Sequence, residues 1–278
     1  MCTSSEVGRA DIAAAFREVG AVSGDILIFH SSLKSMGHVQ GGAPTVIDGA
    51  LDSVSPGGTV AIPTLWYNGK PLERKEEDFD LKNSPAWNGA VAEAMRQDPR
   101  AVRSSHFSHS VSSIGKDAEY LASGHGGGRG YPSPWSETAF AEVSPWSRLY
   151  EHNALYAFIG CEMTSCTMKH WIESRYVAEL LYLLPEAERA KFRSGLAFER
   201  QPGPWCSING RFMRLGLAEK GLIRETRLGD AVLFALRTRP MVDETLEILR
   251  REPEKWFTAA FLQWRQSVLD TVRDSNKI

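Results

Sequence analysis

Two residues one helical turn apart, His170 and Glu173, carry the chemistry that this sequence most clearly suggests. They lie in the stretch CEMTSCTMKHWIESR, residues 161–175, which follows a short apolar strand and then has the pattern of a helix start. Residues at positions i and i+3 share a helix face, so Glu173 can accept a hydrogen bond from one imidazole nitrogen of His170. That bond would set the tautomer and leave the other nitrogen basic, as a general base requires. A surface histidine beside a helix start capped by Ser165 or Thr167 is the alternative interpretation.

A second polar cluster follows another short apolar run. Residues 26–29, Ile-Leu-Ile-Phe, are typical of a strand that is buried on both faces. Directly after this strand come His30, Ser31, Ser32, Leu33 and Lys34. Because ligands of open α/β sheets bind outside the carboxyl ends of the strands, this cluster is well placed for a binding site.

A third cluster lies within residues 103–115. Its polar members are His106, Ser108, His109 and Ser110. Two histidines at i and i+3 could share a metal ion if the segment were helical. The serines and Val111 favour a strand or a loop instead, so we predict no metal site here.

The elements that must position these clusters alternate between strand and helix. Apolar patterns predict strands at 26–29, 59–62, 154–160 and 229–236, and helices at 9–20, 45–54, up to 96, up to 184 and at 238–273. This alternation favours a single α/β domain over residues 1–278, with a central mixed, largely parallel sheet flanked by helices. Residues 186–230 shift towards arginine and turn residues, so we expect an inserted subdomain there that covers the site and shapes a substrate pocket.

Charge and cysteine usage limit the class of protein. The 278 residues have a net charge of -2 and 42% hydrophobic residues, which is ordinary for a globular protein and argues against general nucleic-acid binding. Four cysteines, at positions 2, 161, 166 and 206, match neither a zinc spacing nor a disulfide scaffold. The N-terminus has no signal-peptide core, and no apolar run approaches the ~18 residues of a membrane span. We therefore expect a cytoplasmic protein with free thiols.

Several motifs in one order are similar to those of a single family. These motifs are GDILIFHSSLKSMG, GGAPTVIDGAL, GGTVAIPT, FDLKNSPAWNG, RSSHFSHSVSSIGKDAE, SPWSRLY and TMKHWIES. Over about residues 24–175 the chain resembles the aminoglycoside 3-N-acetyltransferases, which are acetyl-CoA-dependent antibiotic acetyltransferases with a fold unrelated to the GNAT fold. The C-terminal third is similar only in outline.

The resemblance implies roles for members of all three clusters. His170 would be the general base for an attacking amine, with Glu173 orienting it and Thr167 close to the reacting carbonyl. The acetyl-CoA arm would be held by His30, Ser31, Ser32, Leu33, Lys34 and Ser35. The pantetheine or the thioester would be contacted by Ser108, His109, Ser110 and Val111. Residues 106–110 depart from the usual His-Pro-Thr-His-Ser of the family, which affects the shape of the acyl site.

The acceptor amine is open between two classes. An aminoglycoside is the expectation from the family, and such a polycation needs carboxylates in its pocket. Residues 186–230 instead hold more arginine and lysine than acid. That excess suits an anionic amine, such as a phosphonate- or nucleotide-linked one, unless these cations form a solvated surface. Either acceptor implies a role in antibiotic resistance or antibiotic biosynthesis.

Two other function classes are compatible with the residues. A cysteine acyltransferase or hydrolase would use Cys166 as nucleophile and His170, four residues later on a helix face, as base. A non-catalytic module would bind CoA without turnover. We expect acetyl-CoA and a small amine as partners, not nucleic acid or a membrane. The sequence leaves the oligomeric state open, and a homodimer is compatible with it.

Overall fold

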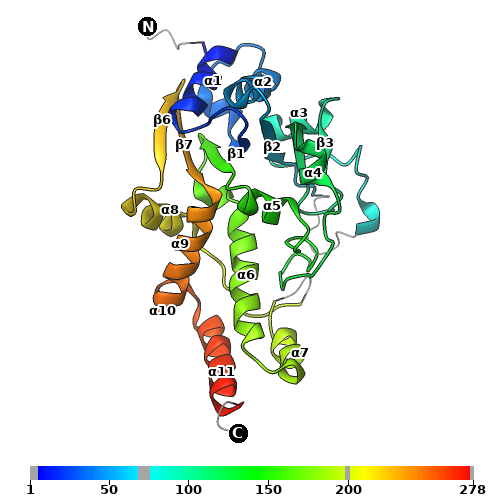
Figure 1. Ribbon diagram of the computed structural model, residues 1–278, viewed down its shortest axis with the longest axis vertical. Coiled ribbons are helices and arrows are strands. Elements are labelled where there is room, and N and C mark those ends of the chain that lie inside the picture. Colours follow the sequence, from blue (N-terminus) through cyan, green and yellow to red (C-terminus); the bar gives the residue numbers. More distant parts are fainter. Residues whose placement is uncertain (1–5, 68–75, 198–200, 276–278) are drawn as a thin grey trace.

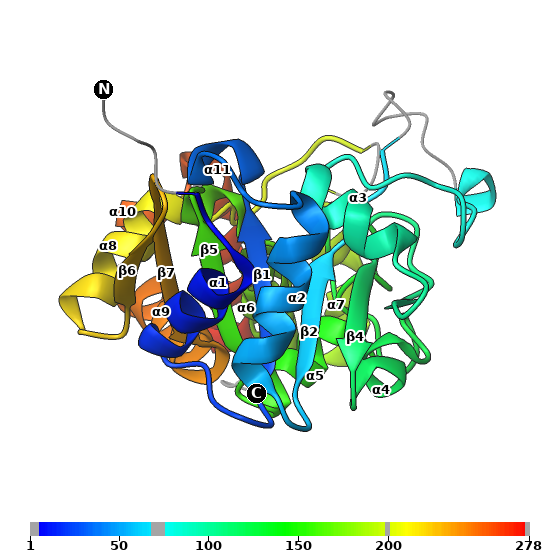
Figure 2. The ribbon, with the colours of Figure 1, turned by 90° about the horizontal axis from the view of Figure 1, so that it is seen from above.

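The computed structural model describes residues 6–67, 76–197 and 201–275. Within them, strands form one sheet in the order β3-β4-β2-β1-β5-β7-β6 (Figures 1 and 2). The strands are β1 Ile26–Ser31, β2 Thr59–Pro63, β3 Val102–Arg103, β4 Val111–Gly115, β5 Leu155–Ile159, β6 Arg224–Leu228 and β7 Ala231–Arg237. The predicted α/β class with a mixed sheet is confirmed.

The parallel part of the sheet is smaller than the sequence suggested. Only β1 with β2 and β1 with β5 run parallel, which is two of the six pairings among the described strands. Two of the four antiparallel pairs, β3 with β4 and β6 with β7, are joined by short connections. Between β6 and β7, for example, only Gly229 and Asp230 intervene, and Gly229 has φ +57°. A two-residue turn of this kind closes a hairpin, whereas parallel strands need a long crossover.

Both faces of the central strands are buried, which explains their continuous apolar sequences. In β1, Leu27 and Phe29 face the core under α1 Arg9–Glu18 and α2 Ala43–Val54, while Ile26 and Ile28 face the opposite core. Strands β5 and β7 alternate in the same way. Successive side chains of a strand point to opposite faces, so each strand contributes to two hydrophobic layers. Figure 2 shows α1 and α2 on one side of the sheet and α6 and α9 on the other.

The remaining helices agree with most of the predicted ranges. They are α3 Ala90–Gln97, α4 Ala118–Ala122, α5 Pro145–Glu151, α6 Met168–Tyr182, α7 Glu186–Ser194, α8 Gly210–Glu219, α9 Thr238–Arg251, α10 Pro253–Trp256 and α11 Ala259–Ser275. The C-terminal helical region is divided into three helices, with Pro253 at the start of the second. A proline is tolerated at the first turn of a helix but interrupts a helix interior. None of the described helices is both long and apolar enough to cross a membrane.

Segment 186–230 is continuous with the main body of the fold. The segment ends with strand β6 and the turn after it, and β6 pairs with β7 at the edge of the sheet. Trp205, Cys206, Ile208 and Met213 are buried in the same hydrophobic cluster as α6. Cys206, like Cys161 and Cys166, is a free thiol.

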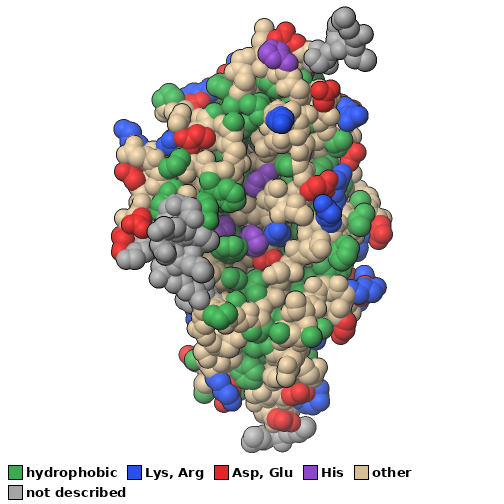
Figure 3. All heavy atoms as spheres, turned by 180° about the vertical axis from the view of Figure 1, so that it is seen from behind, with side chains coloured by type: hydrophobic (Ala, Val, Ile, Leu, Met, Phe, Trp, Pro, Cys, Tyr) green, Lys and Arg blue, Asp and Glu red, His purple; other side chains and the backbone are tan. Residues whose placement is uncertain are grey.

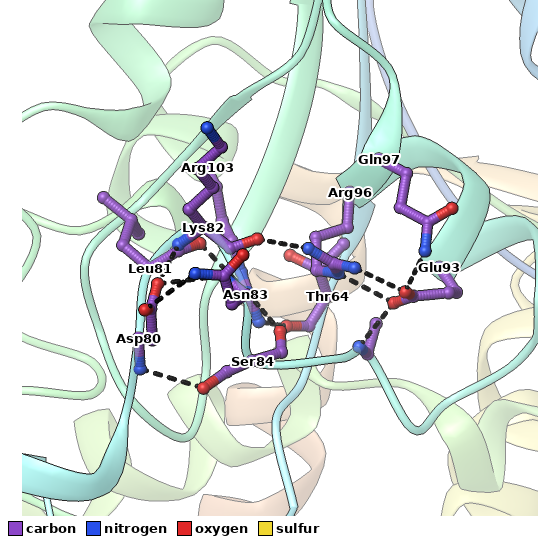
Figure 4. A network of polar contacts seen from close by, with 11 residues as sticks. Thr64, Asp80, Leu81, Lys82, Asn83, Ser84, Glu93, Arg96, Gln97 and Arg103 are labelled. Carbon is purple, nitrogen blue, oxygen red and sulfur yellow. Dashed lines mark hydrogen bonds and ion pairs between the residues drawn. The ribbon is translucent and has the colours of Figure 1, made fainter.

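Arg103 ties the segment before α3 to the end of the sheet. Its guanidinium donates to the carbonyl oxygens of Ser84 and Thr64, each at 2.7 Å (Figure 4). Its Nε donates to Ser110 Oγ at 3.1 Å. Burial, aided by the nearby Arg96, lowers the pKa of Arg103 to about 10. The arginine stays charged at neutral pH. It links the segments that contain Thr64, Ser84 and Ser110, beside the end of β2 and the start of β4.

Candidate active site

His170 and Glu173 form the hydrogen bond that their spacing predicts. His170 Nδ1 lies 2.8 Å from Glu173 Oε2 in the first turns of α6. The carboxylate is 2% exposed and the imidazole 24% exposed. A carboxylate accepts, so Nδ1 carries the proton in this contact, and Nε2 is the nitrogen that would act as the base.

Three rings surround this imidazole. The ring centroids of Trp135, His109 and Phe140 lie 5.5, 6.3 and 6.4 Å from that of His170. Figure 3 shows histidine side chains gathered near the middle of one face, where the surface is hollowed. Trp135 and Phe140 were not predicted as site residues. They belong to the irregular connection between α4 and α5, which has no helix or strand pattern.

The loop between β3 and β4 brings His109 to this place. His106 Nδ1 accepts hydrogen bonds from the backbone N–H groups of Ser108 and His109, each at 3.2 Å. The ring proton is therefore on Nε2, which donates to Thr138 Oγ1. Ser108 Oγ in turn contacts His109 Nδ1 at 2.8 Å. The segment is loop and strand, as predicted. In the described residues, no three or more His, Cys, Asp or Glu side chains gather in a way that could hold a metal ion.

A cavity of about 580 Å³ opens at the carboxyl ends of β1 and β2. It is lined by His30, Ser31, Ile62, Leu65, Trp87, Asn88, Gly89, Ala92, Cys161, Thr164 and Ser165. We call it the strand-end cavity. None of these lining residues is an aspartate, glutamate, lysine or arginine. Thr164 and Ser165 come just before α6, so this cavity lies next to the helix that carries His170.

His30 lines the strand-end cavity and is uncharged there at neutral pH. Its Nε2 lies 3.0 Å from the hydroxyl of Tyr156, and the side chain is 8% exposed. Burial, with a smaller contribution from the charge of Lys169, lowers the pKa of His30 to about 4. The imidazole therefore offers hydrogen bonds but no charge at neutral pH.

The other residues of the second polar cluster form the turn beside the cavity. Ser32 N donates to Ile159 O at 2.8 Å, and Ser35 Oγ donates to Ser32 Oγ at 2.7 Å. Leu33 and Lys34 belong to the short 3₁₀ helix Leu33–Met36, where Lys34 is exposed.

The last two residues of the third cluster have internal positions. Ser110 Oγ donates to Thr64 O at 2.7 Å, and Val111 is 1% exposed in β4. Thr167 is the N-cap residue of α6, and its side chain makes no capping hydrogen bond. It is 3% exposed and three residues before His170.

A second cavity, of about 520 Å³, lies between α6, α7 and the connection before α5. We call it the α7 cavity. Leu181 lines it and is eleven positions after His170, so the two residues face the same side of α6. Its charged lining residues are Glu137, Glu186, Arg189 and Arg193. Arg193 forms an ion pair with Glu137, and Arg189 lies over the ring of Tyr182.

Most other cations of segment 186–230 that have a described partner lie away from this cavity. Arg214 bridges Glu162 and Glu225, and Lys220 pairs with Glu244. The arginine excess that favoured an anionic acceptor is therefore partly a paired, solvated surface.

Cys166 lacks the environment of a nucleophile. It is fully buried, and this burial raises the pKa of its thiol to about 11. Cys161 lines the strand-end cavity, but burial raises its pKa to about 12. A thiol reacts as the thiolate, so neither cysteine is activated at neutral pH.

Comparisons with known proteins identify one family. The family model described as aminoglycoside 3-N-acetyltransferase matches residues 28–250. Aminoglycoside N(3)-acetyltransferase IX of Micromonospora chalcea is 28% identical over 172 residues, which cover 56% of this chain and 58% of that protein. Aminoglycoside N(3)-acetyltransferase III of Salmonella sp is 31% identical over 247 residues, covering 77% of this chain and 83% of that protein. The chain thus spans little more than half of the first relative.

Solved structures share the fold. The aminoglycoside acetyltransferase AAC(3)-Xa has a TM-score of 0.68 at 23% identity, over 88% of this chain and 93% of that one. The binary complex of AAC-IIIb with CoASH has a TM-score of 0.68 at 20% identity, over 92% of this chain and 99% of that one.

Proposed function

Because the chain belongs to the aminoglycoside 3-N-acetyltransferase family, we propose that it transfers the acetyl group of acetyl-CoA to a primary amine of an antibiotic or antibiotic precursor. The observation that carries this proposal is the His170–Glu173 hydrogen bond at the start of α6, a helix that has one cavity just before it and another along its second half. One cavity would take the pantetheine arm and the other the amine. The base would stand between them.

The two catalytic side chains divide the proton transfer. Alkyl amines titrate near ~10, so most of the acceptor is an ammonium at pH 7 and only the free amine attacks. As its nitrogen bonds to the acetyl carbonyl carbon, His170 Nε2 takes one N–H proton. The carbon–sulfur bond then breaks, and the imidazolium returns that proton to the departing thiolate. Glu173 holds the Nδ1 proton throughout, and a base of this kind contributes ~100- to 10,000-fold.

Thr167 is our candidate for stabilising the oxyanion. It is the N-cap residue of α6, and its hydroxyl does not cap that helix. A hydroxyl near the positive end of a helix is suited to the negative charge that develops on the carbonyl oxygen.

The strand-end cavity suits the pantetheine arm of acetyl-CoA. Its lining residues carry no formal charge, and they offer hydroxyl, amide and imidazole groups from Ser31, Asn88 and His30. Pantetheine has two amides and no charge, so neutral hydrogen-bonding groups match it. The CoASH bound to AAC-IIIb supports CoA as the co-substrate here.

For the acceptor we propose an aminoglycoside amine bound in the α7 cavity. The names of the relatives support this class. Glu137 and Glu186 can contact ammonium groups there. Arg189 and Arg193 line the same cavity and favour the second candidate, an amine that also carries an anionic group. In that case Glu137 would remain paired with Arg193.

A thiol-release assay with acetyl-CoA and a panel of aminoglycosides and anionic amines tests the proposal. We expect turnover with at least one of them in the wild-type protein. His170→Ala should abolish turnover while calorimetry still detects acetyl-CoA binding. His152→Ala is the matched control, because this histidine is exposed at the end of α5. Absence of thiol release with every amine, or a fully active His170→Ala, would contradict the proposal.

A further inference from the structure

The buried carboxylate of Glu173 receives two donors besides His170. Trp205 Nε1 donates to Oε2 at 3.1 Å, and the backbone N–H of Ile208 donates to Oε1 at 2.7 Å. Both come from the extended segment before α8, more than thirty residues along the chain. We call Trp205 and Ile208 the Glu173 clasp.

These two donors fix the orientation of the Glu173 carboxylate, which the i, i+3 contact with His170 cannot fix alone. A glutamate has three side-chain torsions, and one hydrogen bond to His170 leaves the carboxylate plane free to rotate. With one donor on each oxygen from outside the helix, both the position and the plane of the carboxylate are set. A carboxyl group that is 2% exposed also needs such donors to replace the water that it has lost.

The segment that supplies the clasp is itself held in place. Asn209 caps α8 by accepting the N–H groups of Arg211 and Phe212. Gly210 packs so closely on the 3₁₀ helix before α6 that a Cβ there would overlap the backbone of Met163. The clasp is therefore anchored to the same piece of chain that leads into the catalytic helix.

We propose that Trp205 is a positioning residue of the catalytic base, acting through Glu173 to keep the lone pair of His170 aimed at the acceptor amine. The proposal rests on the proposed function for the role of His170. The geometry of the clasp is independent of which amine is acetylated. The catalysed reaction slows when the hydrogen bonds that hold its general base in place are weakened, even if substrate binding is unchanged.

The test is Trp205→Phe, which keeps a ring in the core and removes only the indole N–H. Hydrogen bonds to charged groups are worth enough that we expect kcat to fall by about 10-fold, with KM for acetyl-CoA within about twofold of wild type. Trp264→Phe is the matched control. Trp264 is as buried as Trp205, at 9% exposure, and its Nε1 donates to Phe192 O at 2.9 Å, away from the dyad.

Two further measurements separate positioning from general damage. In a Glu173→Ala background, Trp205→Phe should cause little additional loss of kcat, because the side-chain acceptor through which it acts is gone. The His170 Nδ1 proton, identified in NMR spectra by its absence in His170→Ala, should shift or broaden in Trp205→Phe and not in Trp264→Phe.

The outcomes also separate this inference from the proposed function. Equal kcat values in Trp205→Phe and Trp264→Phe, with an unchanged Nδ1 resonance, would overturn the positioning role. An equal fall of kcat with and without Glu173 would overturn it as well. A protein that acetylates no amine, yet whose Nδ1 resonance responds to Trp205→Phe, would refute the proposed function and leave the clasp intact.

Discussion

We expect His30 to cause much of the loss of stability when the pH is lowered from 7 to 5. The pKa of this histidine falls from 6.5 to about 4 in the folded protein, chiefly because of burial. Between these values the unfolded chain binds the proton and the native protein does not, so unfolding becomes more favourable as the pH falls. The stabilising contribution is complete above pH 6.5 and is lost as the pH approaches 4. From pH 7 to pH 5 the two pKa values correspond to a loss of about 2 kcal/mol.

Urea unfolding at pH 7 and pH 5 measures this contribution in wild type and in His30→Gln. The glutamine can still bond to Tyr156 but has no proton to gain. Wild type should lose about 2 kcal/mol more unfolding free energy than His30→Gln between the two pH values. Since other titrating groups are shared, their effects largely cancel in this difference.

Tyr156→Phe is the control for the cause of the pKa shift. It removes the hydroxyl that contacts His30 and leaves the histidine buried. If burial dominates, this variant is less stable at both pH values but retains the wild-type pH dependence. Equal losses in wild type and His30→Gln would refute the reasoning, because they would mean that His30 takes up its proton equally in both states.

Three more predictions concern the neighbourhood of the site. Cys166→Ala should keep most of the turnover in the thiol-release assay, because the raised pKa keeps this thiol protonated; complete loss would restore the cysteine-nucleophile hypothesis. Gly210→Ala should lower the free energy of unfolding in urea by about 1–3 kcal/mol, because its Cβ overlaps Met163; an unchanged midpoint would contradict this. Arg103→Met should cost about 2 kcal/mol and speed limited proteolysis within 76–88, because Ser84 and Thr64 lose their donor; wild-type protease resistance would argue against that role.

Much of the fold could be predicted from local patterns. Buried strands such as β1 and β5 have continuous apolar sequences because both faces are covered, and that signal needs no knowledge of the neighbours. Strand β6, with the sequence RETRL, was not predicted. It is an exposed edge strand, so charged side chains replace the apolar pattern, and only its pairing with β7 makes it a strand.

The candidate site shows the same division between local and long-range information. The His170–Glu173 contact could be predicted because both residues lie in one helical turn. The ring of Trp135 beside His170 and the donor from Trp205 to Glu173 could not, since tertiary packing brings them together across long stretches of chain. The excess of arginine in 186–230 has the same limit as a signal, and the charge of the acceptor stays a prediction. Composition does not reveal that Arg214 already bridges two glutamates.

The start of α6 is held from two directions, and this bears on how the base would work. From α5, the hydroxyl of Ser147 accepts the indole N–H of Trp171, the residue after His170, at 3.2 Å. From the segment before α8, the Glu173 clasp fixes the carboxylate. Neither contact reaches a cavity directly, so loosening either should reduce kcat more than substrate affinity. A base whose helix is held by α5 on one side and by the clasp on the other loses little further freedom when the acceptor binds.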